Sequence, residues 1–346
     1  MKQRIYAVIA LLLFVGAVIF FYNRFAFTGS HVNTQPITIT DYKLNTYVTV
    51  TIYDSTDSAL LDECMALCDK YELLFSRTDS ESELYKLNHG LLPQSADGYY
   101  TVSEELYEII GIGKKYSELS DDTFCIAMEP LTSLWNFTDG EKIVPTHDKI
   151  DAVLPALNSD AVLLRAPNEI RFSKEGMGID LGAIAKGYIA DKLKEYLLSQ
   201  NVNSALIYLG GNVLCIGEKE TGGFKIGIEK PFDADGTPVA VVSISDSSVV
   251  TSGIDERYFE KDGNFYHHIL DKHTGYPIEN ELTAVTIITP VSTDADALST
   301  TCFSLGLEKG LDLLESLGYA GGFFITKDGE YHYTEGFAQK YNLEMQ

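Results

Sequence analysis

Residues 182–216 read GAIAKGYIADKLKEYLLSQNVNSALIYLGGNVLCI, and they predict one helix followed by two strands. In residues 182–198, apolar side chains recur at helical spacing opposite a charged face. Residues 204–209 and 213–216 are short apolar segments on either side of Gly210-Gly211, a pair that suits a tight hairpin turn. A helix that leads into an antiparallel hairpin favours an α+β fold over a regularly wound α/β sheet.

The rest of the chain continues this mixture of helices and strands. Helical spacing predicts helices at residues 58–74 and 103–119, and a helical region from about residue 293. Strand patterns occur at residues 47–53, 224–228, 239–244, 265–270 and 284–288. We therefore expect a single α+β domain over residues 41–346, with a mixed, largely antiparallel sheet.

The N-terminus has a different character. Residues 5–22 are uncharged and apolar apart from two tyrosines, and Lys2 and Arg4 precede them. This length is just sufficient to cross a bilayer as a helix, and no small-x-small cleavage site follows it. We expect residues 1–27 to be an uncleaved signal anchor with one transmembrane helix and residues 28–40 to be a linker. The positive charges before the span favour a cytoplasmic N-terminus. We therefore expect a single-pass protein of the cell membrane whose catalytic domain is extracytoplasmic.

Net charge limits the ligands of the protein. The 346 residues include 50 acidic and 26 basic side chains, for a net charge of -24. Such a chain repels a nucleic-acid backbone, which argues against non-specific DNA or RNA binding. An anionic ligand such as a pyrophosphate needs a local positive source: a metal ion, a helix N-terminus or a placed lysine.

Residues 180–187, DLGAIAKG, are a candidate for that source. Small residues at the start of a helix let a ligand approach the backbone, and the first N–H groups of a helix attract phosphate. Lys186 adds a point charge. The alternative is close helix packing with Lys186 in solvent, because the spacing matches neither the P-loop nor the dinucleotide fingerprint.

Residues 293–300, TDADALST, place Asp296 and Thr300 four apart on one face of a helix. Carboxylate and hydroxyl oxygens are hard ligands that suit Mg²⁺ better than zinc. The alternative is that Thr293 or Asp294 caps the helix while Asp296 only favours its dipole. That alternative leaves Thr300 unexplained.

Paired histidines occur in residues 266–275, YHHILDKHTG. Neighbouring strand residues face opposite sides, so only one of His267 and His268 can point into a given site. A histidine can act as a general base toward a hydroxyl group. A zinc site is a rival interpretation, although the spacing matches no common zinc pattern, and structural histidines are the other alternative.

Together these segments resemble the ApbE family of FAD:protein FMN transferases, from about residue 41 to the C-terminus. The matching blocks occur in family order: Phe75-Ser76, Ser82-Glu83-Leu84, Leu87-Asn88, Pro130-Leu131, Leu134-Trp135, Phe137, residues 180–191, Gly210-Gly211, Thr251-Ser252-Gly253, Arg257-Tyr258-Phe259, His268-Ile269-Leu270-Asp271, Thr274-Gly275 and residues 295–300. Ordered blocks along most of the chain make a chance resemblance improbable.

The resemblance implies one T-fold-like α+β domain that binds FAD between its halves. It also implies a Mg²⁺ ion held by the backbone carbonyl of Ala183 and the side chains of Asp296 and Thr300. The FAD contacts that it implies are Asp180, Lys186, Ile269, Thr78, Phe124 and Cys125. The chain departs from the family pattern at Thr78, where an aromatic residue is frequent, and at Cys125, where an aspartate is common.

The implied reaction is transfer of FMN from FAD to a threonine or serine of an acceptor protein, with release of AMP. We assign catalytic roles to His268, Asp271 and Asp296: the first two deprotonate or orient the hydroxyl group, and Asp296 can share the base role. Two alternatives stay open, a Mg²⁺-dependent FAD pyrophosphatase giving FMN and AMP and a non-catalytic, membrane-tethered FAD-binding protein. The expected acceptor is an extracytoplasmic flavoprotein of an electron-transfer system.

Overall fold

The computed structural model describes residues 35–137, 142–233 and 236–346. Residues Pro36–Gln346 form one compact unit. Its first strand, β1 (Ile37–Lys43), begins next to Pro36 and includes residues 37–40 of the expected linker. The expected transmembrane segment lies outside the described residues, and within the three described ranges no helix has the length and apolar character needed to span a membrane.

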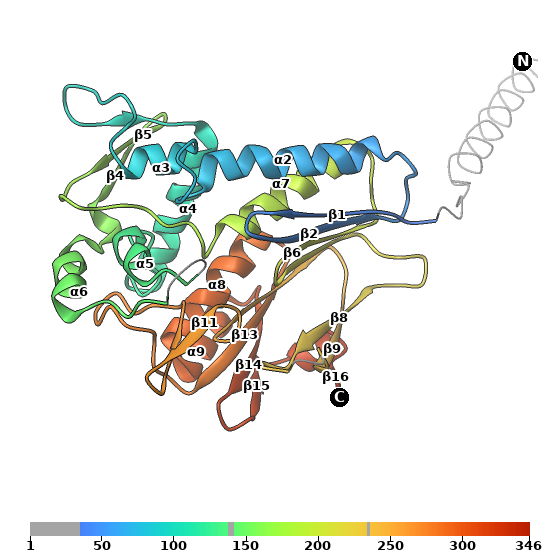
Figure 1. The fold of residues 1–346 in the computed structure, drawn as a ribbon. Coiled ribbons are helices and arrows are strands. Elements are labelled where there is room, and N and C mark those ends of the chain that lie inside the picture. Colours follow the sequence, from blue (N-terminus) through green and yellow to red (C-terminus); the bar gives the residue numbers. More distant parts are fainter. Residues whose placement is uncertain (1–34, 138–141, 234–235) are drawn as a thin grey trace, which may run out of the picture. The chain divides into compact units, whose positions relative to one another are not determined.

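A single eight-stranded sheet forms the centre of this unit (Figure 1). Its strand order is β1-β2-β6-β7-β10-β13-β14-β15, and every neighbouring pair is antiparallel. The strands after β1 are β2 (Thr46–Ile52), β6 (Ala205–Leu209), β7 (Asn212–Ile216), β10 (Ser248–Gly253), β13 (Leu282–Thr289), β14 (Gly321–Thr326) and β15 (Tyr331–Tyr333). The predicted α+β class with an antiparallel sheet is confirmed.

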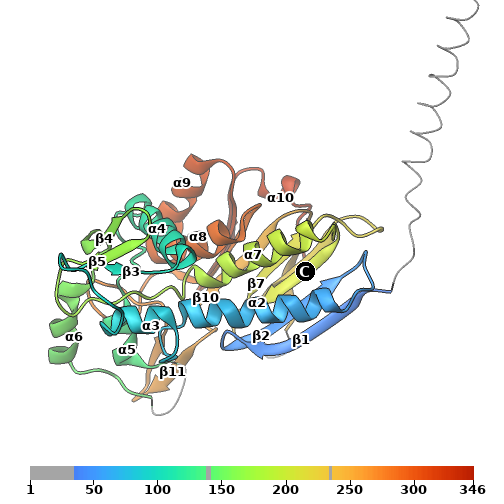
Figure 2. The same cartoon turned by 90° about the horizontal axis from the view of Figure 1, so that it is seen from above.

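Helices cover one face of the sheet. They are α2 (Ala59–Phe75), α7 (Ala185–Ser199), α8 (Ser292–Leu305) and α9 (Leu307–Leu317), with α4 (Glu104–Leu119) packed against α2 and α8. Figure 2 shows α2 and α7 side by side in front of the sheet. Strand residues alternate between the two faces, so Leu214 packs with these helices while Cys215 points to the other side.

A smaller layer covers the second face. It consists of β8 (Phe224–Glu229), β9 (Pro238–Ile244), β16 (Glu344–Met345) and α10 (Phe337–Lys340). Outer elements flank the two layers: α3 (Glu83–Asn88), β3 (Tyr100–Thr101), α5 (Glu129–Trp135), α6 (His147–Val153), the 3₁₀ turns Leu154–Ala156 and Ser159–Ala161, β4 (Val162–Arg165), β5 (Glu169–Phe172), β11 (Tyr258–Lys261) and β12 (Asn264–His267).

Two predicted boundaries were wrong, and both errors lie in segments proposed for the site. The helix predicted from residue 182 begins at Ala185, because the Asp180 carboxylate accepts the N–H of Gly182 at 2.8 Å and closes a turn before the helix. The strand predicted to residue 270 ends at His267, and the chain bends at His268, whose N–H donates to the carbonyl of Arg257. Both segments therefore reach the site as turns.

Candidate active site

Helices α7 and α8 meet at Gly187. A Cβ atom on Gly187 would lie 2.3 Å from the carbonyl oxygen of Ser292 and 2.7 Å from Cβ of Asp296. No larger residue fits at this distance. The packing interpretation of residues 180–187 is therefore right for Gly187, and this packing brings α8 to the start of α7.

Each of these helices supplies a carboxylate to the N-terminus of the other. Asp296 on α8 accepts the N–H of Gly187 at its Oδ2 atom, at 2.8 Å. Asp191 on α7 accepts the N–H groups of Ser292 (2.9 Å) and Thr293 (2.8 Å) and the hydroxyl of Thr293 (2.6 Å). The sequence analysis predicted that the first N–H groups of α7 attract a phosphate, but the N–H of Gly187 donates to Asp296 instead.

The same contacts change the expected cap of α8. Its N-terminal N–H groups are satisfied from α7 by Asp191 and not by the side chain of Thr293 or Asp294. Asp294 accepts the hydroxyl of Tyr116 instead, at 2.6 Å. Sequence reasoning missed Asp191, although its position four residues after Gly187, on the same face of α7, is a signal that could have found it.

The proposed metal ligands lie where these helices touch. Burial raises the pKa of the Asp296 carboxyl above its ordinary range, while Lys186 and the N–H of Gly187 oppose that shift. Thr300 follows one turn later, with its hydroxyl 3.2 Å from that of Ser252. Gly187 directs its N–H to Asp296, so the carbonyl of Ala183, four residues before it, is open to another partner.

This donor set fits Mg²⁺, which takes oxygen ligands and completes its shell with substrate phosphates and water. A buried carboxylate with a raised pKa gains most from a nearby cation. Within the described part of the chain, no three His, Cys, Asp or Glu side chains gather in a way that could hold a metal. A Mg²⁺ ion at Asp296 would therefore depend on hydroxyl, backbone and substrate oxygens.

Lys186 reaches the β6–β7 turn, where its Nζ donates to the carbonyl of Gly210 at 3.0 Å. Glu256 lies at the same turn, since a Cβ atom on Gly211 would be 3.8 Å from its Oε1. Glu256 is accessible to solvent yet surrounded by protein on most sides, and this crowding raises its pKa. Lys186 opposes that shift and Asp296 adds to it, which places all three charges together. Sequence reasoning missed Glu256.

The two histidines separate as predicted. His267 is buried, donates from Nε2 to the carbonyl of Ile278 at 3.0 Å and packs against the ring of Phe303. Burial lowers the pKa of His267 to about 4. His268 is half-buried on the site side: its surroundings, together with Arg257, His267 and Lys186, lower its pKa to about 3.

Asp271 and Ile269 lie in the segment that follows. The Asp271 carboxylate accepts the N–H of His273 at 2.8 Å and the hydroxyl of Thr274 at 3.3 Å. These are the contacts of a residue that organises a turn. Ile269 is buried, and its carbonyl accepts the N–H of Ile278. Their roles toward the acceptor and FAD stay predictions.

Asp180 is held by several donors. Its carboxylate accepts the hydroxyl of Thr132 at 2.8 Å and forms an ion pair with Arg77 at 3.1 Å, in addition to the N–H of Gly182. Thr78, next to Arg77, is exposed. The carboxylate therefore ties the end of α2 to α5 and to the turn before α7. Sequence reasoning missed Arg77.

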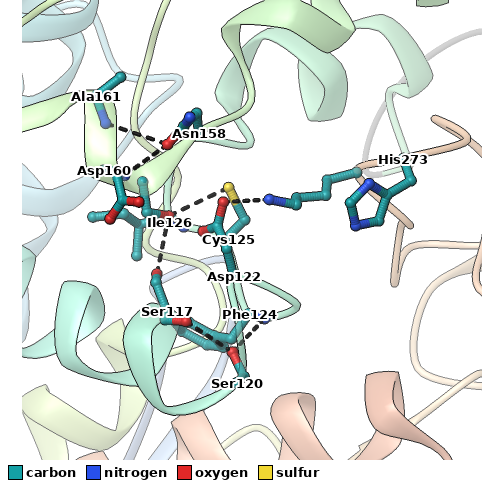
Figure 3. Close-up of polar contacts among 12 residues, drawn as sticks. Ser117, Ser120, Asp122, Phe124, Cys125, Ile126, Asn158, Asp160, Ala161 and His273 are labelled. Carbon is teal, nitrogen blue, oxygen red and sulfur yellow. Dashed lines mark hydrogen bonds and ion pairs between the residues drawn. The ribbon is translucent and has the colours of Figure 1, made fainter.

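Phe124 and Cys125 lie in a segment beside His273 of the 271–275 turn (Figure 3). Phe124 is buried, whereas Cys125 is half-buried and accepts a hydrogen bond from Ser159. Burial raises the pKa of the Cys125 thiol, and Asp122 adds to the shift. Asp122 pairs with Lys272, which joins this segment to the turn after His268.

One cavity of about 660 Å³ lies between α4, α7 and the start of α8. Asp191 and Thr293 contribute to its lining, but Lys186, Asp296 and Thr300 do not. This cavity therefore does not include the charges described above. We place the candidate site by its chemistry, at Lys186, Asp296, Thr300 and His268, and not by this cavity.

Comparison with known proteins decides the family. Residues 44–323 match the model of the ApbE family. This chain belongs to the ApbE family. An ApbE relative from Klebsiella pneumoniae (strain 342), named FAD:protein FMN transferase, is 39% identical over 277 residues, which are 79% of this chain and 84% of the relative. One from Treponema pallidum (strain Nichols), with the same name, is 35% identical and covers 82% of this chain and 81% of its own length.

Solved ApbE structures share the fold. The crystal structure of the ApbE protein from Thermotoga maritima has a TM-score of 0.80 at 31% identity, over 88% of this chain and 99% of that one. The apo form of the flavinyl transferase ApbE from Pseudomonas stutzeri has a TM-score of 0.77 at 28% identity, over 89% and 97%. The resemblance found in the sequence is thus confirmed at the level of the ApbE family and its fold.

Proposed function

We propose that this chain is an FAD:protein FMN transferase, an enzyme that moves the FMN half of FAD onto a side chain of another protein. The observation that carries the proposal is the group of Lys186, Asp296 and His268 around the α7–α8 contact, in a chain whose relatives bear that name. In a protein of net charge -24, Lys186 together with a Mg²⁺ ion held at Asp296 would supply the local positive source that an FAD pyrophosphate needs.

In the proposed reaction, a serine or threonine hydroxyl of the acceptor attacks the phosphorus on the FMN side of FAD. A phosphoester bond forms between the hydroxyl oxygen and FMN, and the bond to the AMP phosphate breaks. The electron pair of that bond leaves with AMP. The hydroxyl proton must pass to a base, so a base has to lie beside the attacking oxygen.

His268 has the protonation state required of that base. Its Nδ1 atom lies 3.3 Å from the carbonyl of Arg257, and a carbonyl can only accept, so Nδ1 carries the proton and Nε2 keeps its lone pair. The low pKa of His268 keeps the ring neutral at pH 7. A bound pyrophosphate would bring negative charge and raise that pKa toward the working range.

The Ala183 carbonyl, Asp296 and Thr300 would hold Mg²⁺, which supplies charge neutralisation on the pyrophosphate when it is bound. Lys186 adds a second positive charge from α7 and is held toward the site by the Gly210 carbonyl. Asp180, fixed by Arg77 and Thr132, is proposed to contact FAD from the turn before α7.

The location and acceptor are part of the same proposal. We propose a membrane anchor at residues 1–27, a linker at residues 28–40 and an extracytoplasmic transferase domain at residues 41–346. The apolar segment at residues 5–22 and the two basic residues before it support this arrangement. An extracytoplasmic flavoprotein of an electron-transfer system suits it, because a covalently held flavin cannot diffuse away outside the cell.

Flavin fluorescence in a denaturing gel tests the function. Residues 31–346 are incubated with FAD, Mg²⁺ and a candidate acceptor domain, with EDTA as the control. We expect a fluorescent acceptor band that depends on Mg²⁺ and survives denaturation. Free FMN and AMP without a band, despite a verified acceptor, would identify a pyrophosphatase. Bound FAD without any turnover would identify a flavin-binding protein.

A further inference from the structure

Three aromatic side chains form a partly exposed cluster beside the site, here called the aromatic surface: Phe232, Tyr258 and Phe265. Tyr258 and Phe265 stack with ring centroids 4.9 Å apart, and Phe232 meets both edge-on at 5.6 Å and 5.8 Å. Phe232 is 51% exposed and Tyr258 is 42% exposed. Most aromatic residues of this chain are more buried, so these rings leave apolar area in contact with water.

The backbone holds Phe232 in this position. Its φ is +62°, a left-handed conformation that bulky residues seldom adopt. The carboxylate of Asp255 accepts the N–H of Phe232 at 3.1 Å and so fixes the loop against the segment that leads into β11. Phe232 therefore has a strained backbone although its ring is exposed, so burial of the ring does not offset the strain.

The aromatic surface and the site share the segment from Asp255 to Tyr258. Glu256 lies at the β6–β7 turn, where Lys186 is bound. Arg257 accepts the N–H of His268 with its carbonyl, and Tyr258 follows directly. In β12, His267 pairs in register with Tyr258, so the proposed base comes one residue after the partner of that tyrosine. Tyr258, Phe265 and His267 therefore share one face of the hairpin, and Glu256 and Arg257 link that face to Lys186 and to the backbone of the proposed base.

We propose that the aromatic surface, together with the exposed side chain of Arg257, docks the acceptor protein. This inference rests on the proposed function, because that function requires a protein hydroxyl beside His268. Tyrosine, phenylalanine and arginine are enriched in protein interfaces, and tyrosine and arginine often dominate their binding energy. Exposed Glu256 and Glu260 flank the rings, so the docked segment has an apolar side chain and neutral or basic neighbours.

The same charges disfavour other occupants. Anionic lipid headgroups would meet Glu256 and Glu260, and a second copy of this chain carries the same net charge of -24. An acceptor segment gains from both features, since its hydroxyl enters the site while its apolar side chain covers the rings. Substitution of the rings should then weaken the affinity for the acceptor and leave the affinity for FAD unchanged.

The test compares surface variants with a matched control. Phe232→Asn tolerates the left-handed backbone, and Tyr258→Thr suits a strand, so the double variant keeps the fold. Tyr333→Thr is the control, because Tyr333 is also a strand tyrosine, is 44% exposed and lies on β15 at the edge of the main sheet. The probe is the membrane fraction of a source strain that lacks this chain, used at graded dilutions and read by in-gel flavin fluorescence.

We expect the double variant to need about tenfold more acceptor for half-maximal labelling. Its dissociation constant for FAD, measured by flavin fluorescence quenching, stays within about twofold of wild type, and Tyr333→Thr behaves as wild type. Unchanged half-saturation in the double variant overturns the docking proposal, and so does a parallel loss of FAD affinity. The same variants are also sedimented with vesicles that contain phosphatidylglycerol, and weaker sedimentation with unchanged labelling would overturn the proposal in favour of a membrane surface. If wild-type protein labels nothing, the proposed function itself fails.

Discussion

Asp296 accepts the backbone N–H of Gly187 at 2.8 Å, across 109 residues of sequence. The same carboxylate is the proposed Mg²⁺ ligand, so it has two separable tasks: a cap for α7, which needs only an oxygen acceptor, and a metal ligand, which needs negative charge. Substitutions at this position can distinguish the two tasks, because asparagine keeps the first and removes the second.

Asp296→Asn is expected to fold with nearly the wild-type melting temperature, because the amide oxygen still accepts the N–H of Gly187. Its FMN transfer should fall at least about 100-fold, since the charge that binds the metal is lost. Asp296→Ala should lose transfer and also about 1 kcal/mol of stability with the cap. Thermal melts and gel fluorescence measure both effects. A fully active Asp296→Asn with normal Mg²⁺ dependence would remove Asp296 from the metal site.

Gly187→Ala is expected to lower the free energy of unfolding by about 1–3 kcal/mol, because its Cβ would press on Ser292 and Asp296. Gly111→Ala is the matched control. Gly111 lies in α4, and a Cβ atom there meets only ordinary contact at 3.8 Å from Leu164. This control should gain about 0.5–1 kcal/mol from helix propensity. Urea denaturation measures both, and equal stabilities for the two variants would contradict the close contact.

Thr300→Val should raise the Mg²⁺ concentration needed for half-maximal transfer about tenfold, because a hydroxyl ligand is lost while the shape is nearly kept. Its melting temperature without Mg²⁺ should stay close to wild type, since Thr300 is half-buried. Thr301→Val on the same helix is the control: its hydroxyl bonds to the carbonyl of Ala297. A normal Mg²⁺ titration of Thr300→Val would count against Thr300 as a ligand.

The lowered pKa of His267 predicts that the folded protein loses stability in mild acid. Its pKa is lowered to about 4 in the folded chain, so the unfolded chain, with a pKa near 6.5, binds the proton more readily as pH falls. The stabilisation is complete above about pH 6.5 and is lost as pH falls toward 4. Between pH 7 and pH 5, the free energy of unfolding should drop by about 2 kcal/mol from this residue. Urea denaturation at both pH values should show a smaller drop in His267→Gln.

The sequence predicted what is local. Residues 182–198 and 293–305 carry their helical spacing within the helices themselves, and the strand alternation separates buried His267 from His268. The motif residues Lys186, Asp296 and Thr300 were found because each lies on a short, recognisable segment, and the structure brings the first two together.

What the sequence did not predict depends on contacts between distant segments. Asp191 caps α8 from 102 residues away, and the ion pair of Arg77 with Asp180 joins the end of α2 to a turn before α7. Strand β14 was missed because it begins with Gly321 and Gly322, which are poor strand formers. Both positions are crowded: added Cβ atoms would lie 2.5 Å from Tyr341 and 2.3 Å from Leu314. The pattern of one segment does not contain such neighbours.

The exchange of carboxylates between α7 and α8 also sets the order in which the enzyme becomes competent during synthesis. The ribosome makes α7 long before Asp296, so in an incomplete chain the N–H of Gly187 has no carboxylate from α8 to bind. Asp191 likewise lacks the N–H groups of Ser292 and Thr293 until these residues have been made. A nascent or truncated chain that ends before α8 therefore lacks Asp296 and Thr300, two of the proposed Mg²⁺ ligands, and we expect no reaction with FAD until nearly the whole domain has been translated and folded.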